Sequence, residues 1–198
     1  MTITAEQVKL LRDRTGAGMM ECKKALAETQ GDLEKAIDAL RKAGNEKMAG
    51  RTGRAASEGL VEAYIHPGNR VGVLIEVNCE TDFVARTPEF AELTRNLAMQ
   101  VAALGAEFVK REDVPAERVE RERAIYAGQV EGQGKPAAIV EKIVEGKLEK
   151  FFAEVCLLEQ PSIRDDKVTV RELVVQAAGQ TGENVVVRRF ARFRLGQE

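Results

Sequence analysis

The stretch LVEAYIHPGNRVGVLIEVNC, residues 60–79, decides the fold class. β-branched residues occupy every second position in its second half: Val71, Val73, Ile75 and Val77. Because successive side chains of a strand point to opposite faces, these residues would share one face of a sheet. Pro67-Gly68-Asn69 supplies turn residues between the halves. The stretch therefore predicts a β-hairpin with strands at 60–66 and 70–79.

Helical spacing follows the hairpin. Pro88 favours a helix start, and apolar residues recur behind it at helical intervals: Phe90, Leu93, Leu97 and Val101. Further helices are expected after Pro115, over 137–152 with Ile139, Ile143 and Val144 inward, and over 170–178, with a loop at 128–136. A final strand is expected at 184–195. Together these segments predict an α+β fold, a small antiparallel sheet covered by helices.

The first 44 residues predict three short helices instead. Thr4 and Gln7 match a capping box at the first helix. Thr15-Gly16-Ala17-Gly18 interrupts the chain, Gly31-Asp32 ends the second helix, and Gly44 is expected to end the third. Residues 45–57 predict a linker, or a frayed helix followed by a linker. We expect a three-helix bundle of ubiquitin-associated type at 1–45, a linker at 46–56, and the α+β core at 57–198.

Composition disfavours several classes of function. Lys plus Arg is 30 and Asp plus Glu is 32, so net charge gives no long-range attraction to nucleic acid. The single histidine, His66, and three scattered cysteines do not match a catalytic triad or a zinc site. The glycines at 16 and 18 lack the Lys and Ser or Thr of a phosphate loop. We therefore expect no enzyme activity, no cofactor and no bound nucleotide.

No targeting segment is evident. The N-terminus has no apolar run of signal-peptide length, and no stretch has the about 18 apolar residues of a membrane helix. Scattered cysteines fit a reducing compartment. We expect a cytoplasmic protein that does not contact a membrane.

Two segments are candidates for binding a partner. Met19 and Met20 begin a helix beside a glycine break, and methionine is common at adaptable binding surfaces; alternatively, one or both fill the bundle core. In the second segment, Asn78–Arg86, Phe83 and Val84 follow a strand end. Phe83 is either an exposed binding anchor or a cap on the core beneath the next helix.

Three long segments resemble the elongation factor Ts family. They are LRDRTGAGMMECKKAL near the start, VLIEVNCETDFVAR in the middle and GENVVVRRFARFRLG near the end, in the family's order. The resemblance covers essentially the whole chain. It implies a guanine-nucleotide exchange factor that binds elongation factor Tu in its GDP form, promotes GDP release so that GTP can bind, and also binds the nucleotide-free form.

The resemblance also implies roles for particular residues. The residues that match the contact between the N-terminal bundle and elongation factor Tu are Lys9, Arg12, Met19 and Met20. The residues that match the segment that dislodges Mg²⁺ from elongation factor Tu are Thr81, Asp82, Phe83 and Val84. In that segment Phe83 acts as a wedge and Asp82 adds polar contacts beside it.

The chain is short for this family. Longer members carry two related core halves and a helical excursion, whereas this sequence has room for one core half. A homodimer in which a second copy replaces the missing half is therefore expected, with two-fold symmetry. In that case residues 57–198 also form the dimerisation domain.

Two other functions were weighed. Arg188, Arg189, Arg192 and Arg194 alternate with Phe190 and Phe193, which could hold a single RNA strand. A strand with one polar face explains most of this pattern. Its polar parity holds Arg188, Arg192 and Arg194, its apolar parity holds Val185, Val187, Ala191, Phe193 and Leu195, and Arg189 is the exception. Cys79 could be a nucleophile, but the neighbouring Glu80 and Asp82 would raise its pKa and disfavour the thiolate. We expect no direct binding to nucleic acid and no thiol chemistry.

Overall fold

The computed structural model describes residues 3–51, 53–131 and 136–197. The chain forms two compact units. The first comprises Met1–Glu62, Ile75–Asn96 and Arg171–Arg188. The second comprises Ala63–Leu74, Leu97–Val170 and Arg189–Glu198. The division predicted from the sequence, at 1–45, 46–56 and 57–198, stays a prediction.

The N-terminal helices form the predicted bundle. They are α1 (Ala5–Thr15), α2 (Met19–Glu28) and α3 (Leu33–Ala49). The capping box at Thr4 is present, with the Gln7 N–H donating to the Thr4 hydroxyl over 3.2 Å. Seven buried residues make the bundle core: Val8, Leu11, Cys22, Ala25, Leu26, Ala36 and Ile37.

The predicted end of α3 at Gly44 is wrong, because the helix continues to Ala49. A Cβ at Gly44 would lie 3.3 Å from Val175 Cγ1 on α8 (Val170–Thr181). The glycine therefore allows a close approach between two helices, although a helix-interior glycine is about 1 kcal/mol less favourable than alanine. One turn earlier, Arg41 pairs with Glu172 of α8 at 3.6 Å.

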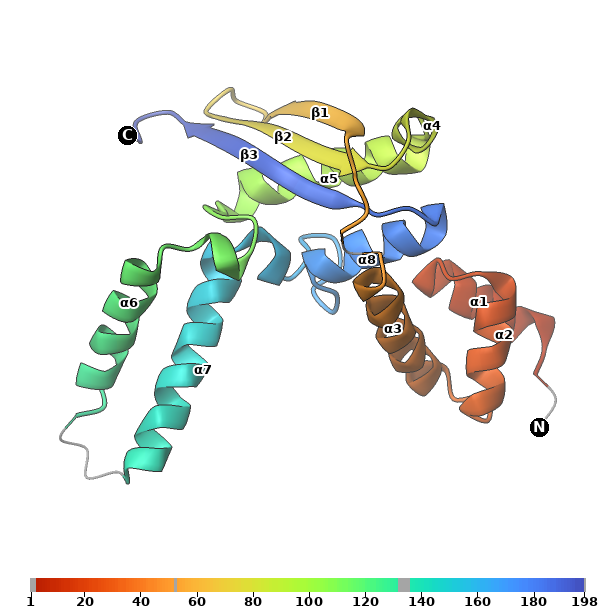
Figure 1. Ribbon diagram of the computed structural model, residues 1–198, viewed down its shortest axis with the longest axis horizontal. Helices are drawn as coiled ribbons and strands as arrows, with labels where there is room; N and C mark the ends of the chain where they lie inside the picture. The colour runs from red at the N-terminus through yellow and green to blue at the C-terminus, as the bar shows by residue number, and fades with distance from the viewer. Residues whose placement is uncertain (1–2, 52, 132–135, 198) are drawn as a thin grey trace. The chain divides into compact units, whose positions relative to one another are not determined.

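Three strands form the sheet: β1 (Glu58–Ile65), β2 (Val71–Cys79) and β3 (Val186–Arg194), in the order β1-β2-β3 (Figure 1). On β2 the alternation predicted from the sequence is confirmed for Val73, Ile75 and Val77, which are buried, whereas Val71 at the start of the strand is half-buried. Gly68 and Asn69 both have positive φ in the hairpin turn, at 92° and 55°. The strands and helices together confirm the α+β class.

The remaining helices begin with the short α4 (Asp82–Ala85) and the long α5 (Pro88–Leu104). Helix α5 begins at Pro88 as predicted, and its apolar residues Phe90, Leu93, Leu97 and Val101 are buried. The 3₁₀ turns η1 (Arg111–Asp113) and η2 (Leu157–Glu159) flank a two-helix hairpin. That hairpin consists of α6 (Ala116–Gly128) and α7 (Ala137–Val155), which lie antiparallel in Figure 1. Most of the loop predicted at 128–136 lies outside the described residues.

One predicted inward residue of α7 is exposed. Val144 is buried and Ile143 half-buried, but Ile139 is 47% exposed. Helix α7 packs mainly on α6, and a single partner helix covers only a narrow apolar stripe. The base of the hairpin is better covered: Arg118 stacks on the rings of Phe108 and Phe151, 5.5 Å from each centroid.

The alternation predicted for β3 holds only in its first part. Val185 and Val187 are buried, as expected, but Phe193 and Leu195 are exposed although they share the same parity. Arg192, predicted on the polar face, is half-buried. The inward parity shifts by one residue across Arg188 and Arg189, which are both exposed. A one-residue shift transfers every later side chain to the other face.

Candidate functional site

Phe83 projects from a short helical turn rather than from a loop. The turn is α4, and its first N–H groups are capped by Thr81, whose hydroxyl oxygen accepts from the Val84 N–H over 3.3 Å. Phe83 and Val84 differ in exposure: the side chain of Val84 is 7% exposed and that of Phe83 is 79% exposed. The interpretation of Phe83 as a cap on the core is therefore wrong, and the interpretation as an exposed side chain is confirmed.

Asp82 lies beside Phe83 at the surface. Its carboxylate pairs with Arg86, four residues later on the same turn, at 2.9 Å. Pairs of this kind contribute about 0.2–0.5 kcal/mol on a helix surface. Asp82 is thus accessible to a partner and is paired with Arg86 in the free protein.

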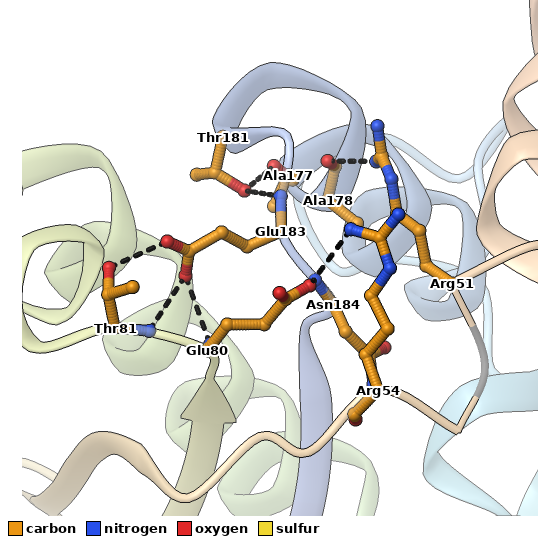
Figure 2. Close-up of polar contacts among 9 residues, drawn as sticks. All are labelled: Arg51, Arg54, Glu80, Thr81, Ala177, Ala178, Thr181, Glu183 and Asn184. Carbon is orange, nitrogen blue, oxygen red and sulfur yellow. Dashed lines mark hydrogen bonds and ion pairs between the residues drawn. The ribbon is translucent and has the colours of Figure 1, made fainter.

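The backbone before Phe83 is held by a residue distant in the sequence. Glu183 follows α8, and its Oε2 accepts the N–H groups of Glu80 and Thr81 over 3.0 and 3.1 Å. Its Oε1 accepts the Thr81 hydroxyl over 2.6 Å. Figure 2 shows the carboxylate directed at Thr81. Sequence reasoning missed Glu183, since a glutamate after a helix end carries no signal for this contact.

A second carboxylate, from the β2 side, binds the segment that follows α8. Glu80 Oε1 accepts the Asn184 N–H over 2.6 Å and lies 3.5 Å from the Arg54 guanidinium (Figure 2). The side-chain amide of Asn184 donates to the Arg54 carbonyl over 3.0 Å. Arg51 donates to the carbonyl of Ala178 on α8. These contacts hold Arg51, within the predicted linker, against α8, and hold Arg54, in the same segment, against Glu80 and Asn184.

The N-terminal candidates are all at the surface. Met19 and Met20 begin α2 and are 47% and 77% exposed, while Lys9 and Arg12 are exposed on α1. Neither methionine belongs to the bundle core, so the alternative that they fill it is wrong. Both this group and Phe83 lie within the first compact unit.

Cys79 is unsuited to nucleophilic chemistry. The side chain is buried, and its thiol lies 3.2 Å from the Thr81 carbonyl, to which it donates. Burial first, and then the negative charge of Glu183, raise the pKa of the thiol above its ordinary value. The protonated form therefore prevails at neutral pH. Among the described residues, no group of three or more His, Cys, Asp or Glu could hold a metal ion.

The arginine-rich strand does not present its aromatic rings together. Phe193 is 73% exposed, whereas Phe190 is half-buried and three positions away, on the opposite parity of β3. Stacking of successive bases needs rings on one surface. No helix in the described part of the chain is long and apolar enough to cross a bilayer.

Comparison with known proteins decides the family. The sequence profile described as "Elongation factor TS" matches residues 2–197. The chain belongs to the elongation factor Ts family. The protein named elongation factor Ts in Carboxydothermus hydrogenoformans is 57% identical over 195 residues, which cover 98% of this chain and 90% of the relative. Its counterpart in Moorella thermoacetica is 58% identical, covering 98% and 96%. That of Caldanaerobacter subterraneus is 55% identical and covers 98% of both.

These relatives are therefore of nearly the same length as this chain. The resemblance noted in the three sequence segments is confirmed. The chain is accordingly an elongation factor of protein biosynthesis.

Proposed function

We propose that this chain is a guanine-nucleotide exchange factor for elongation factor Tu. It binds elongation factor Tu·GDP, dislodges Mg²⁺ and promotes release of GDP so that GTP can bind. The observation that carries the proposal is the exposure of Phe83, 79%, on a backbone held by Thr81 and Glu183. An exposed aromatic ring on a fixed mount is suited to enter a partner.

The physical basis lies in the demands of the magnesium ion. Mg²⁺ needs near-ideal octahedral geometry and bridges nucleotide phosphates to protein oxygens. A ring pushed between elements of the partner displaces some of those oxygens and weakens both Mg²⁺ and GDP. By linkage, GDP must weaken the binding of the exchange factor by the same factor. No covalent bond is made or broken, so the function requires no catalytic residue.

The N-terminal bundle supplies the second contact. Lys9, Arg12, Met19 and Met20 dock on the GTP-binding domain of elongation factor Tu. Their exposure supports this role, since polarisable methionine side chains adapt to a partner surface. The bundle contributes affinity, while Thr81, Asp82, Phe83 and Val84 disturb the magnesium site: Phe83 as the wedge, Asp82 through polar contacts, and Thr81 and Val84 by anchoring the turn.

We also propose a homodimer, supported by an exposed apolar group in the second compact unit. Four apolar side chains in or directly after the strands are exposed: Ile65 60%, Leu74 49%, Phe193 73% and Leu195 65%. They line an open hollow of ≈ 630 Å³. A contiguous apolar surface of this kind is typical of an interface. A second copy related by a two-fold axis would cover it.

Light scattering after size-exclusion chromatography tests the dimer. We expect twice the chain mass for the wild type and a single chain mass for Phe193→Glu. Ile125→Glu, at a 44% exposed position on α6, is the matched control and should leave the dimer intact. A monomeric wild type at working concentration would refute the dimer without affecting the exchange function.

The site of action follows from the proposed role. A factor that renews elongation factor Tu works in the cytoplasm and needs neither a membrane nor direct contact with nucleic acid. The separation of Phe190 from Phe193 disfavours the RNA-binding alternative.

Release of a fluorescent GDP analogue from the cognate elongation factor Tu tests the exchange function. The wild-type chain should accelerate release in a concentration-dependent, saturable way. Folded wild type that leaves the release rate unchanged would rule the function out. A shift of labelled RNA at low salt that disappears as salt rises would then favour the RNA-binding alternative.

A further inference from the structure

Phe83 has almost no packing to fix its direction. The ring is 79% exposed, so its position depends on the backbone that carries it. That backbone leaves β2 at Cys79 and enters α4 at Asp82. Whatever fixes Glu80 and Thr81 therefore fixes where the ring points.

The carboxylate of Glu183 binds both residues of this backbone segment. It accepts the Glu80 and Thr81 N–H groups at 3.0 and 3.1 Å and the Thr81 hydroxyl at 2.6 Å. We call these three hydrogen bonds the Glu183 clamp. Hydrogen bonds to an ionised carboxylate are about twice as strong as neutral ones. The partners are more than a hundred residues apart in the sequence, so the clamp is a tertiary contact.

Thr81 connects the Glu183 clamp to the helical turn α4 through its hydroxyl group. Its hydroxyl proton is donated to Glu183, which leaves the oxygen free to accept the Val84 N–H over 3.3 Å. The hydroxyl therefore cannot rotate without losing one of these contacts. Phe83 lies between Thr81 and Val84, the two residues joined by this cap.

Glu183 is itself held in place. Its N–H donates to the Thr181 hydroxyl over 3.4 Å, and that hydroxyl donates to the Ala177 carbonyl on α8 over 2.9 Å. The next residue, Asn184, donates its N–H to Glu80 over 2.6 Å. The two chain segments thus exchange hydrogen bonds in both directions, as Figure 2 shows. A support fixed on both sides can hold a ring against a partner.

We propose that Glu183 is a positioning residue for exchange: through Thr81 it holds Phe83 in the orientation that enters the partner. The inference rests on the proposed function, because it concerns the same wedge. Glu183 does not touch the nucleotide. It raises the rate of GDP release because a factor already docked through its N-terminal bundle does not have to order the backbone of Phe83 as the nucleotide leaves.

Three variants isolate the clamp. Glu183→Ala removes both carboxylate oxygens and so all three hydrogen bonds. Glu183→Gln keeps the shape: its oxygen can accept both N–H groups and its amide can donate to the Thr81 oxygen. Glu172→Ala is the matched control, since it removes a carboxylate from the other end of the same helix, where its partner is Arg41 at 3.6 Å.

Amide hydrogen exchange in the free protein measures the clamp directly. Glu183→Ala should speed exchange of the Glu80, Thr81 and Val84 amides about tenfold, the loss expected for charged hydrogen bonds. Glu183→Gln should retain most of the protection and Glu172→Ala all of it. Unchanged exchange at these amides in Glu183→Ala would overturn the clamp. If Glu183→Ala does not fold, Thr81→Val, which replaces the hydroxyl with a methyl group, should speed exchange at Val84 instead.

Release of the GDP analogue measures its consequence. At saturating factor, Glu183→Ala should lower the maximal rate about tenfold while the half-saturating concentration stays unchanged. Glu183→Gln should restore most of the rate, because it keeps the hydrogen bonds. If the slow release of Glu183→Ala came from the lost negative charge instead, Glu183→Gln would be equally slow. Combined with Phe83→Ala, Glu183→Ala should cause no further loss, because both changes remove the same ring from its site.

The outcomes separate the two proposals. A wild-type rate in Glu183→Ala, or a full additional loss in the double variant, would overturn the positioning role while exchange by the wild type stands. An effect confined to the half-saturating concentration would overturn it as well. A wild-type chain that does not accelerate release would overturn the exchange function itself, whatever the amides show.

Discussion

Replacing Phe83 with alanine should separate stability from function. A fully buried phenylalanine stabilises a fold by about 2.5 kcal/mol. Since the side chain is 79% exposed, only about a fifth of that contribution is present in the free protein. Phe83→Ala should therefore lower the free energy of unfolding by about 0.5 kcal/mol and leave the thermal midpoint nearly unchanged.

The same arithmetic predicts a large effect on exchange. If elongation factor Tu buries the exposed part of the ring, about 2 kcal/mol is lost in Phe83→Ala. If the ring is buried only as the nucleotide leaves, this loss of stabilisation lowers the maximal release rate and not the affinity. A loss of about 2 kcal/mol corresponds to about a thirtyfold slower release. The half-saturating concentration, set by the N-terminal bundle, should stay near the wild-type value.

The assay is stopped-flow release of a fluorescent GDP analogue over a series of factor concentrations, alongside urea unfolding. Ile125→Ala is the control, since it also truncates an exposed apolar side chain, 44% exposed, and should match the wild type in both measurements. A folded Phe83→Ala with the wild-type maximal rate would refute the wedge. A variant that is strongly destabilised would refute the reasoning about exposure.

Three further predictions follow from burial and backbone geometry. Met20→Ala, at a 77% exposed site, should raise the half-saturating concentration about five- to tenfold without changing the maximal rate, as the same release assay measures. Burial raises the pKa of the Cys156 thiol from 9.0 to about 11. The protonated thiol therefore stabilises the fold fully below pH 9, and stability falls as pH rises through 11, so urea midpoints should drop more steeply over that range in the wild type than in Cys156→Ala. Gly59→Ala should lower the free energy of unfolding by at least about 3 kcal/mol in urea titrations, since φ is +143° and the new Cβ would lie 2.1 Å from the Val77 carbonyl oxygen.

Local patterns predicted most of the elements. The alternation of Val73, Ile75 and Val77 fixed the buried face of β2, and Pro88 marked the start of α5. The capping box at Thr4 marked the start of α1. Each of these signals lies within a few residues of its consequence, which is why sequence alone sufficed.

Features that depend on distant contacts were missed. Gly44 has the residue type of a helix end, but its neighbour Val175 on another helix turns it into a point of close packing. The shift in β3 moves Phe193 to the exposed face, and the only sign in the sequence was Arg189 at an apolar parity. Ile139 has the right spacing for burial but too little partner surface.

In the candidate site, too, local features were predictable from the sequence and features set by distant contacts were not. The Asn78–Arg86 segment was found from its composition and resemblance, yet the sequence left Phe83 equally compatible with burial and exposure. Only the fold shows that Phe83 is exposed and Val84 buried, because adjacent residues in a helical turn point about 100° apart. Glu183, more than a hundred residues away, carries no local pattern at all.

The exposure of Phe83 is best understood together with the bonds that surround it. An aromatic ring in water adds little to the fold, and holding its backbone costs conformational entropy. Here that cost is met in the free protein by Glu183 and the Thr81 cap, so little ordering is left for the moment of binding. The hydrophobic gain from burying the ring is then available to displace elements of the partner. The fixed backbone and the exposed ring therefore act together: removing the ring should slow release about thirtyfold, and removing the Glu183 contacts that fix its backbone about tenfold.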